Sequence, residues 1–83
     1  MKTMKQMRAE IDRIDEEIVR LLENRIRVVL EISEYKKEHG IPVNDPARED
    51  DILARLASGK IDEGMIRKVY RTIFSCSRNI QKM

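Results

Sequence analysis

Basic side chains interrupt the apolar stripe of the first predicted helix. Arg25 stands between Leu21 and Val28 in that stripe, where an apolar residue is expected. Lys36 lies on nearly the same face, because eleven helical steps of 100° leave a rotation of only about 20°. A buried cation without a counter-charge is energetically costly. These two residues therefore predict either neutralising carboxylates or an anionic ligand.

Two other segments carry polar groups that could reach the same place. Near the end of the chain, an apolar stripe continues through Ser77 and Gln81, which are four residues apart and share one helix face. The stretch GIPVNDPARED, residues 40–50, adds three charged candidates: Asp45, Arg48 and Glu49. Cations and a neutral amide on converging elements suggest a receptor for a small dianion.

Each candidate also has an ordinary structural role when it is considered alone. Arg25 could extend outward or pair with an acid of another helix. Lys36 could be a solvated residue near a helix C-terminus, and Asp45 could be only a helix cap. The other candidates are compatible with exposed helix surfaces or helix ends: Arg8, Arg48, Glu49, Ser77 and Gln81. The combination of all of them favours a binding site.

The element that must position Arg25 and Lys36 is one long amphipathic helix. It is predicted from Thr3 to about Glu38, with Gly40 as its C-terminal cap. Its apolar residues recur at spacings of three and four: Met4, Met7, Ile11, Ile14, Ile18, Leu21, Val28, Ile32 and Tyr35. Such a helix is about 54 Å long, whereas a compact chain of this length is about 30 Å across. We therefore expect a second copy of the chain to cover the overhanging part in an intertwined homodimer, in preference to an open coiled-coil assembly or a long helix broken in the middle.

Two shorter helices complete the predicted all-α fold. The second begins with Asp45 as N-cap and Pro46 at its first position, and it stops near Ser58–Gly59. The third begins near Asp62 and runs almost to the end of the sequence. The residues of its apolar stripe are Ile66, Val69, Tyr70, Ile73 and Phe74. No strand pattern or internal repeat interrupts this series of helices.

Composition restricts the possible functions. The sequence of 83 residues predicts a single domain, residues 1–83, with a net charge of only +2. The single cysteine, Cys76, and the single histidine, His39, are too few for a disulfide or a zinc site within one chain. We expect them to be a small core residue and a helix-end residue. A lone thiol and the lack of a long apolar run favour a cytoplasmic protein without membrane contact, and the balanced charges argue against nucleic-acid binding.

These pieces together resemble the all-helical class of chorismate mutases over nearly the whole sequence. The resemblance is carried by MRAEIDRIDEEIVRLLENR (residues 7–25), by Lys36, by IPVNDPARE (residues 41–49) and by SRNIQ (residues 77–81). It implies an intertwined dimer of three-helix chains. The connection LASGKIDEG is shorter than the resemblance leads us to expect, so we expect a short second helix and a site end at Gln81 that is frayed until ligand binds.

The resemblance implies three catalytic residues: Arg25, Lys36 and Gln81. Arg25 and the partner subunit's Arg8 would hold the substrate carboxylates, so Arg8 would act in trans. Lys36 and Gln81 would donate hydrogen bonds to the ether oxygen of chorismate.

The resemblance also implies substrate-binding roles for the remaining candidates. Arg48 and Ser77 would complete the polar lining of the site. Asp45 and Glu49 would face the ring hydroxyl of the substrate.

The implied reaction is the pericyclic rearrangement of chorismate to prephenate in phenylalanine and tyrosine biosynthesis, a branch of the shikimate pathway. It needs no nucleophile, metal or cofactor, and we expect none. Two alternatives stay open: an isochorismate-pyruvate lyase of the same fold, and a non-enzymatic helical dimerisation module.

Overall fold

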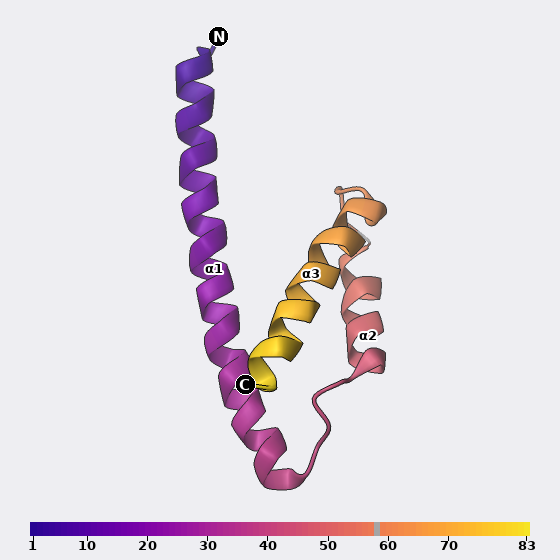
Figure 1. Ribbon diagram of the computed structural model, residues 1–83. Coiled ribbons are helices and arrows are strands. Elements are labelled where there is room, and N and C mark those ends of the chain that lie inside the picture. Colours follow the sequence, from indigo (N-terminus) through magenta and orange to yellow (C-terminus); the bar gives the residue numbers. More distant parts are fainter. Residues whose placement is uncertain (58) are drawn as a thin grey trace.

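The computed structural model describes residues 1–57 and 59–83, and these form three α-helices (Figure 1). The helices are α1 (Met4–His39), α2 (Pro46–Leu56) and α3 (Glu63–Gln81). The prediction of an all-α fold is confirmed, since no strand occurs in the described residues. The predicted end of the second helix at Ser58–Gly59 falls partly outside the described residues, and α2 itself ends at Leu56. In the described part of the chain, no helix combines the length and the apolar character that a membrane span requires.

Capping interactions define both ends of α1. The Thr3 hydroxyl accepts a hydrogen bond from the Gln6 backbone at 3.1 Å, and the Gln6 side chain accepts one from the Thr3 backbone at 2.9 Å. This reciprocal pair is a capping box, which satisfies two otherwise unpaired donors. At the other end Gly40 has φ 64°, a left-handed conformation that favours glycine. The chain therefore turns sharply away from α1 at Gly40, as predicted.

The shorter helices also begin at the predicted caps. The Asp45 carboxylate accepts a hydrogen bond from the Arg48 backbone at 3.1 Å, and Pro46 is the first residue of α2. Asp62 caps α3 in the same way by accepting from the Met65 backbone at 3.0 Å. These caps therefore fix where α2 and α3 start.

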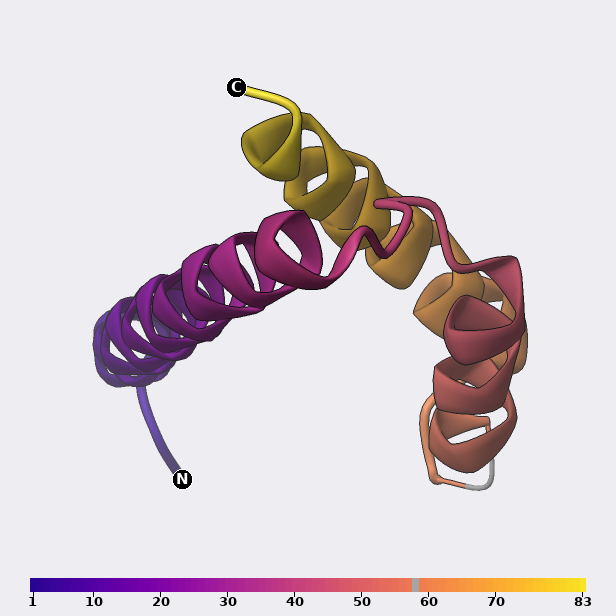
Figure 2. The same ribbon diagram turned by 90° about the horizontal axis from the view of Figure 1, so that it is seen from below.

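The chain is elongated because α1 projects well beyond the other two helices. Its extents are 56 × 24 × 15 Å and its radius of gyration is 16.2 Å, compared with about 12 Å for a compact chain of this length. Figures 1 and 2 show α3 beside only the C-terminal part of α1, with α2 packed along α3. The accessible surface is 7035 Å², whereas a compact monomer of this mass exposes about 5200 Å². Among the described residues, the N-terminal part of α1 therefore has no neighbour outside its own helix.

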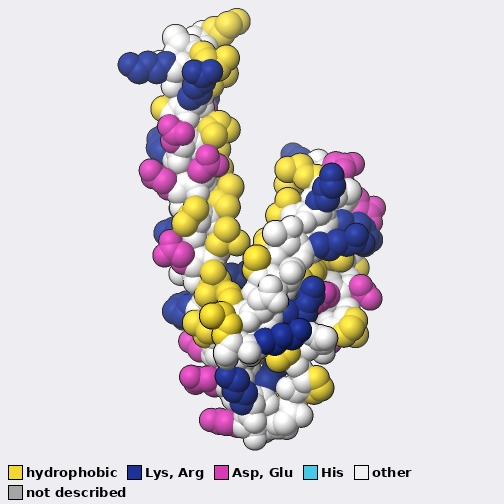
Figure 3. Space-filling model, viewed as in Figure 1, with side chains coloured by type: hydrophobic (Ala, Val, Ile, Leu, Met, Phe, Trp, Pro, Cys, Tyr) yellow, Lys and Arg dark blue, Asp and Glu magenta, His cyan; other side chains and the backbone are white. Residues whose placement is uncertain are grey.

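The small core lies where α3 contacts α1 and α2. Its buried apolar residues are Val29, Leu53 and Phe74, one from each helix. On α1 the buried positions are Val29 and Ser33, whereas Val28 and Tyr35 of the predicted stripe are exposed. The predicted stripe therefore lies beside the face that packs within the chain. Its side chains form a hydrophobic band along α1 (Figure 3), and those in the projecting part are Met4, Met7, Ile11, Ile14, Ile18 and Leu21.

Candidate active site

A pocket of about 330 Å³ lies where the C-terminal half of α1, the start of α2 and the end of α3 meet. Its polar and charged lining comprises Arg25, Lys36, Asp45, Arg48, Glu49, Ser77, Arg78 and Gln81. Apolar walls are supplied by Val29, Ile32, Val43, Ile52 and Phe74. Seven of the eight residues predicted to form the site therefore line one pocket, although they come from distant parts of the sequence.

Arg25 is held in this pocket by two residues of α3. Its Nη1 donates a hydrogen bond to the Ser77 hydroxyl at 2.6 Å, and its guanidinium lies 5.9 Å from the centre of the Phe74 ring. Ser77 in turn donates to the Ile73 carbonyl at 2.9 Å. A guanidinium has five N–H donors, so the bond to Ser77 leaves donors for a ligand. The side chain is thus oriented without being neutralised.

Lys36 reaches across the turn that follows α1. Its Nζ donates to the Val43 backbone carbonyl at 3.1 Å, and the residue is half-buried. In the described part of the chain, the hydrogen-bond partners of Arg25 and Lys36 are therefore a hydroxyl and a carbonyl, both uncharged. Their positive charges are available to an anionic ligand.

Gln81 is the last residue of α3 and is only 8% exposed. Its Nε2 donates to the Ser77 carbonyl at 3.2 Å, whereas its buried Oε1 has no hydrogen-bond partner among the described residues. A buried polar atom without a partner is uncommon and often marks a functional site. The expected fraying at Gln81 is not found, because the residue is helical and packed against the pocket.

The start of α2 brings its three predicted residues to the pocket. Asp45 uses its carboxylate as the helix cap, and Arg48 pairs with Asp51 at 3.1 Å on the outer side of α2. Glu49 is half-buried and faces the end of α3. The turn at residues 40–50 is therefore both a capped connection and a wall of the pocket.

Arg78 is a pocket residue that the sequence analysis did not select. Its Nη1 lies 2.5 Å from Glu49 Oε2, and the two side chains are 32% and 27% exposed. Arg78 follows Ser77 directly, so it is rotated 100° from the stripe that contains Ser77 and Gln81. Arg78 belongs to the SRNIQ segment that the sequence singled out. Its acidic partner, Glu49, is 29 positions away, so the sequence alone did not reveal the pair.

The charge of the pocket suits a dianion. Four cationic side chains line it, Arg25, Lys36, Arg48 and Arg78, against the carboxylates of Asp45 and Glu49. Arg48 and Arg78 have acidic partners, whereas Arg25 and Lys36 have uncharged ones, so these two cations are the ones offered to ligand carboxylates. Arginine and lysine donors are suited to such groups, and arginine can bind a carboxylate through two parallel hydrogen bonds.

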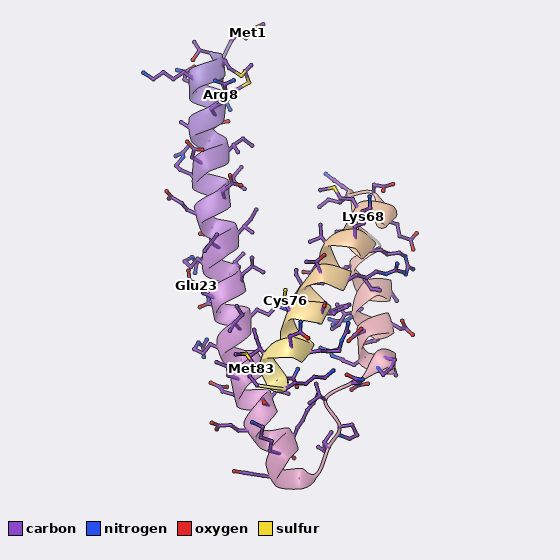
Figure 4. The ribbon with its side chains drawn as sticks, in the orientation of Figure 1. Met1, Arg8, Glu23, Lys68, Cys76 and Met83 are labelled. Atoms are coloured by element: carbon purple, nitrogen blue, oxygen red, sulfur yellow. The ribbon has the colours of Figure 1, made fainter. Side chains whose placement is uncertain are left out.

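Arg8 does not lie at this pocket. It is near the N-terminal end of α1 (Figure 4), 17 residues before Arg25, which corresponds to about 25 Å along a helix. The Arg8 side chain of the same chain is thus too far away to line the site. Its predicted role requires a second copy of the chain.

Two residues outside the binding set were also given structural roles from the sequence. His39 is the last residue of α1, where its ring stacks on Tyr35 and its Nδ1 is 2.9 Å from the Tyr35 carbonyl. The prediction of a helix-end residue is therefore confirmed. Cys76 was predicted to be a core residue, which is wrong for the single chain because its side chain is exposed. It lies on α3 one position before Ser77.

Comparison with known proteins identifies relatives that share this architecture. A solved chorismate mutase from Thermus thermophilus is 39% identical, with a TM-score of 0.85 over 92% of this chain and 99% of the relative. The Helicobacter pylori chorismate mutase in complex with prephenate is 33% identical, with a TM-score of 0.87 over 94% and 88% of the two chains.

A longer relative matches over nearly the whole sequence. The bifunctional chorismate mutase/prephenate dehydratase of Aquifex aeolicus is 34% identical over 99% of this chain, which spans only 25% of that relative. The family model for chorismate mutase type II matches residues 7–82. The chain belongs to the chorismate mutase type II family.

Proposed function

We propose that this protein converts chorismate to prephenate in phenylalanine and tyrosine biosynthesis. The observation that carries the proposal is the position of two cations with uncharged partners, Arg25 and Lys36, in a pocket that also contains the Gln81 amide. Family membership, together with the prephenate bound to the Helicobacter pylori relative, supports this reading. The single thiol fits a reducing, cytoplasmic setting.

The reaction is an intramolecular rearrangement in which a carbon–oxygen bond breaks while a carbon–carbon bond forms. Chorismate itself supplies both reacting groups, so the protein has to select the compact conformer and stabilise the developing charge. Holding both carboxylates in fixed positions achieves the first task. Donors preorganised around the ether oxygen achieve the second, and each contributes about 3–4 kcal/mol at comparable sites.

The residues of the pocket can be assigned to these two tasks. Arg25 binds a substrate carboxylate with the guanidinium donors that Ser77 leaves free. Lys36 and Gln81 donate to the ether oxygen, Lys36 as a cation and Gln81 as a neutral amide. An amide nitrogen carries two hydrogens, so the bond from Gln81 to the Ser77 carbonyl leaves a second one for the substrate.

The remaining lining residues bind the rest of the substrate. Arg48 and Ser77 complete the polar wall. Asp45 and Glu49, the two acids of the lining, face the ring hydroxyl, the neutral donor of chorismate, whose single O–H can donate to one of them.

The functional unit is proposed to be a homodimer in which the partner subunit's Arg8 completes each site. Three features support a second copy as the occupant of the projecting part of α1: the exposed apolar stripe, the excess of accessible surface and the separation of Arg8 from the pocket of its own chain. Two-fold pairing would bury the stripe of both chains and bring each α1 N-terminus towards the other chain's pocket. The substrate would then meet a further arginine.

Two alternatives predict different experimental results. An isochorismate-pyruvate lyase would release pyruvate from isochorismate, and a dimerisation module would act on neither compound. Separate incubations with chorismate and isochorismate, with chromatographic identification of products, distinguish these cases. We expect prephenate from chorismate and no pyruvate from isochorismate. Pyruvate release as the main activity would reassign the substrate, and inertness towards both compounds would contradict the proposed enzyme.

A further inference from the structure

The ion pair between Arg78 and Glu49 differs in its location from the other ion pairs among the described residues. Arg67–Glu63 and Arg27–Glu31, for example, each lie within one helix and have side chains at least 44% exposed. Arg78–Glu49 connects α3 to α2, is at most 32% exposed, and both members line the pocket. Partly desolvated charge pairs interact more strongly than surface pairs, so this one can fix the position of the Glu49 carboxylate.

The pair also determines the charge that a ligand meets at this end of the pocket. Arg78 Nη1 contacts one oxygen of Glu49, Oε2, and an ionised carboxylate has about four acceptor positions. The carboxylate can therefore still accept from a ligand hydroxyl. Its negative charge, however, is already balanced by the guanidinium, so Glu49 offers a hydrogen-bond acceptor that, together with Arg78, carries little net charge.

A positively charged ligand group would bind less favourably beside this ion pair than a neutral hydroxyl. An ammonium group placed against Glu49 would gain attraction to the carboxylate but would also lie close to the Arg78 guanidinium, and like charges repel. A neutral hydroxyl avoids this repulsion. The arrangement thus favours a neutral donor over a cationic one.

We propose that Arg78 is a positioning residue that makes the site specific for chorismate by holding Glu49 in a charge-balanced pair that accepts from the ring hydroxyl and disfavours a positively charged substituent there. This inference rests on the proposed function, because it assumes that the ring hydroxyl faces Glu49. It assigns to Arg78 a role in substrate discrimination in place of direct contact with the reacting atoms.

The test compares two substrates: chorismate and its amino analogue, in which an ammonium group replaces the ring hydroxyl. Arg78→Met removes the charge but keeps an unbranched side chain. For chorismate we expect kcat/KM to fall, mainly through a higher KM, because an uncompensated Glu49 repels the dianion. For the amino analogue we expect kcat/KM to fall less or to rise. The ratio of kcat/KM for the amino analogue to that for chorismate should therefore rise about tenfold or more.

For a second variant we expect the ratio to change in the opposite direction. Glu49→Gln keeps Arg78 but removes the carboxylate, so the ratio of amino analogue to chorismate should fall below the wild-type value. Arg78→Lys restores the charge and should return the ratio towards wild type. Arg71→Met is the matched control, since Arg71 is an exposed arginine of the same helix outside the pocket lining. Arg71→Met should leave kcat/KM for both substrates at the wild-type value.

The outcomes separate this inference from the proposed function. A ratio that moves in opposite directions in Arg78→Met and Glu49→Gln supports the inference. Parallel losses for both substrates, or an unchanged ratio, would overturn it while leaving the chorismate mutase activity of the wild type intact. A wild-type protein inactive towards chorismate would overturn the proposed function, and the inference with it. Circular dichroism of each variant checks the fold, and Arg78→Gln takes the place of Arg78→Met in the same comparison if Arg78→Met does not fold.

Discussion

Arg25 of α1 and Ser77 of α3 are joined by a hydrogen bond of 2.6 Å although they are 52 positions apart in the sequence. Ser77 also donates to the Ile73 carbonyl, so its hydroxyl is fixed by its own helix. The Arg25 guanidinium consequently lies against α3 before any ligand arrives. Preorganisation of this kind lowers the cost of ordering a long side chain when substrate binds.

Removal of the Ser77 hydroxyl should therefore weaken the site without unfolding the protein. We expect Ser77→Ala to lower kcat/KM for chorismate about tenfold, since a hydrogen bond to a charged group contributes about 1.5–3 kcal/mol. Steady-state kinetics measure the change. Thr72→Ala is the control, because Thr72 lies on the exposed side of α3 and bonds only the Lys68 carbonyl in the described part of the chain. Equal activity of Ser77→Ala and wild type would show that Arg25 needs no such support.

The proposed dimer predicts that folding depends on protein concentration. Among the described residues of one chain only three apolar side chains are buried, so a separated monomer should not be stable. We expect the midpoint of thermal unfolding to rise with concentration, because association stabilises only the folded state. Scanning calorimetry over a wide concentration range, together with sedimentation equilibrium, measures this. A folded helical monomer at micromolar concentration would contradict both the dimer and the shared site.

The assignment of Arg8 to the other subunit's site can be tested by mixing two inactive variants. In a heterodimer of Arg8→Ala and Arg25→Ala, one site lacks both arginines and the other retains both. We expect up to half of the native activity per heterodimer after the variants are unfolded together and refolded. The separate variants, treated in the same way, are the control. Inactive mixtures that demonstrably contain heterodimers would show that Arg8 does not complete the partner's site.

Much of the fold could be predicted because its signals are local. Thr3 to Gly40 contains no proline or glycine before its final cap, and Asp45 precedes Pro46 at a helix start, so helix bounds follow from neighbouring residues. Arg25 and Lys36 were found because they interrupt a regular apolar spacing. These signals do not depend on the tertiary structure.

Features that depend on packing between helices could not be predicted. Val29, not Val28, is buried, because the face of α1 that meets α3 is rotated from the apolar stripe that the spacing reveals. Arg78 was missed because its partner, Glu49, belongs to another helix. Cys76 was placed in the core because it is a small apolar residue in a helical segment, yet it is exposed in the single chain.

The proposed role of Gln81 predicts an unusual pH dependence for Gln81→Glu. An ionised glutamate can only accept hydrogen bonds, and it would place negative charge beside an ether oxygen that is itself becoming negative. The protonated acid can still donate, and burial raises the pKa of a carboxyl group. We expect most activity to be lost at about pH 7.5 and largely regained as the pH falls towards about 5.

The measurement is kcat/KM against pH for wild type and Gln81→Glu, with circular dichroism at each pH. Gln81 should add no pH dependence to the kcat/KM of wild type over this range, since an amide donates at every pH used. Gln81→Ala is the control, because it lacks a donor at all pH values and should not recover. A Gln81→Glu profile that matches wild type throughout would mean that Gln81 does not contact the reacting oxygen.

The central claim is that a cationic pocket of this chain accelerates the rearrangement of chorismate, and neighbouring lysines of α1 test it most directly. Lys36 lines the pocket and bonds the Val43 carbonyl, whereas Lys37 is exposed beyond it. The measurement is the initial rate of chorismate disappearance, followed by absorbance, for wild type, Lys36→Met and Lys37→Met. We expect Lys36→Met to lose at least about a hundredfold in kcat and Lys37→Met to match wild type. Equal rates for Lys36→Met and wild type, or no chorismate consumption by wild type, would contradict the account.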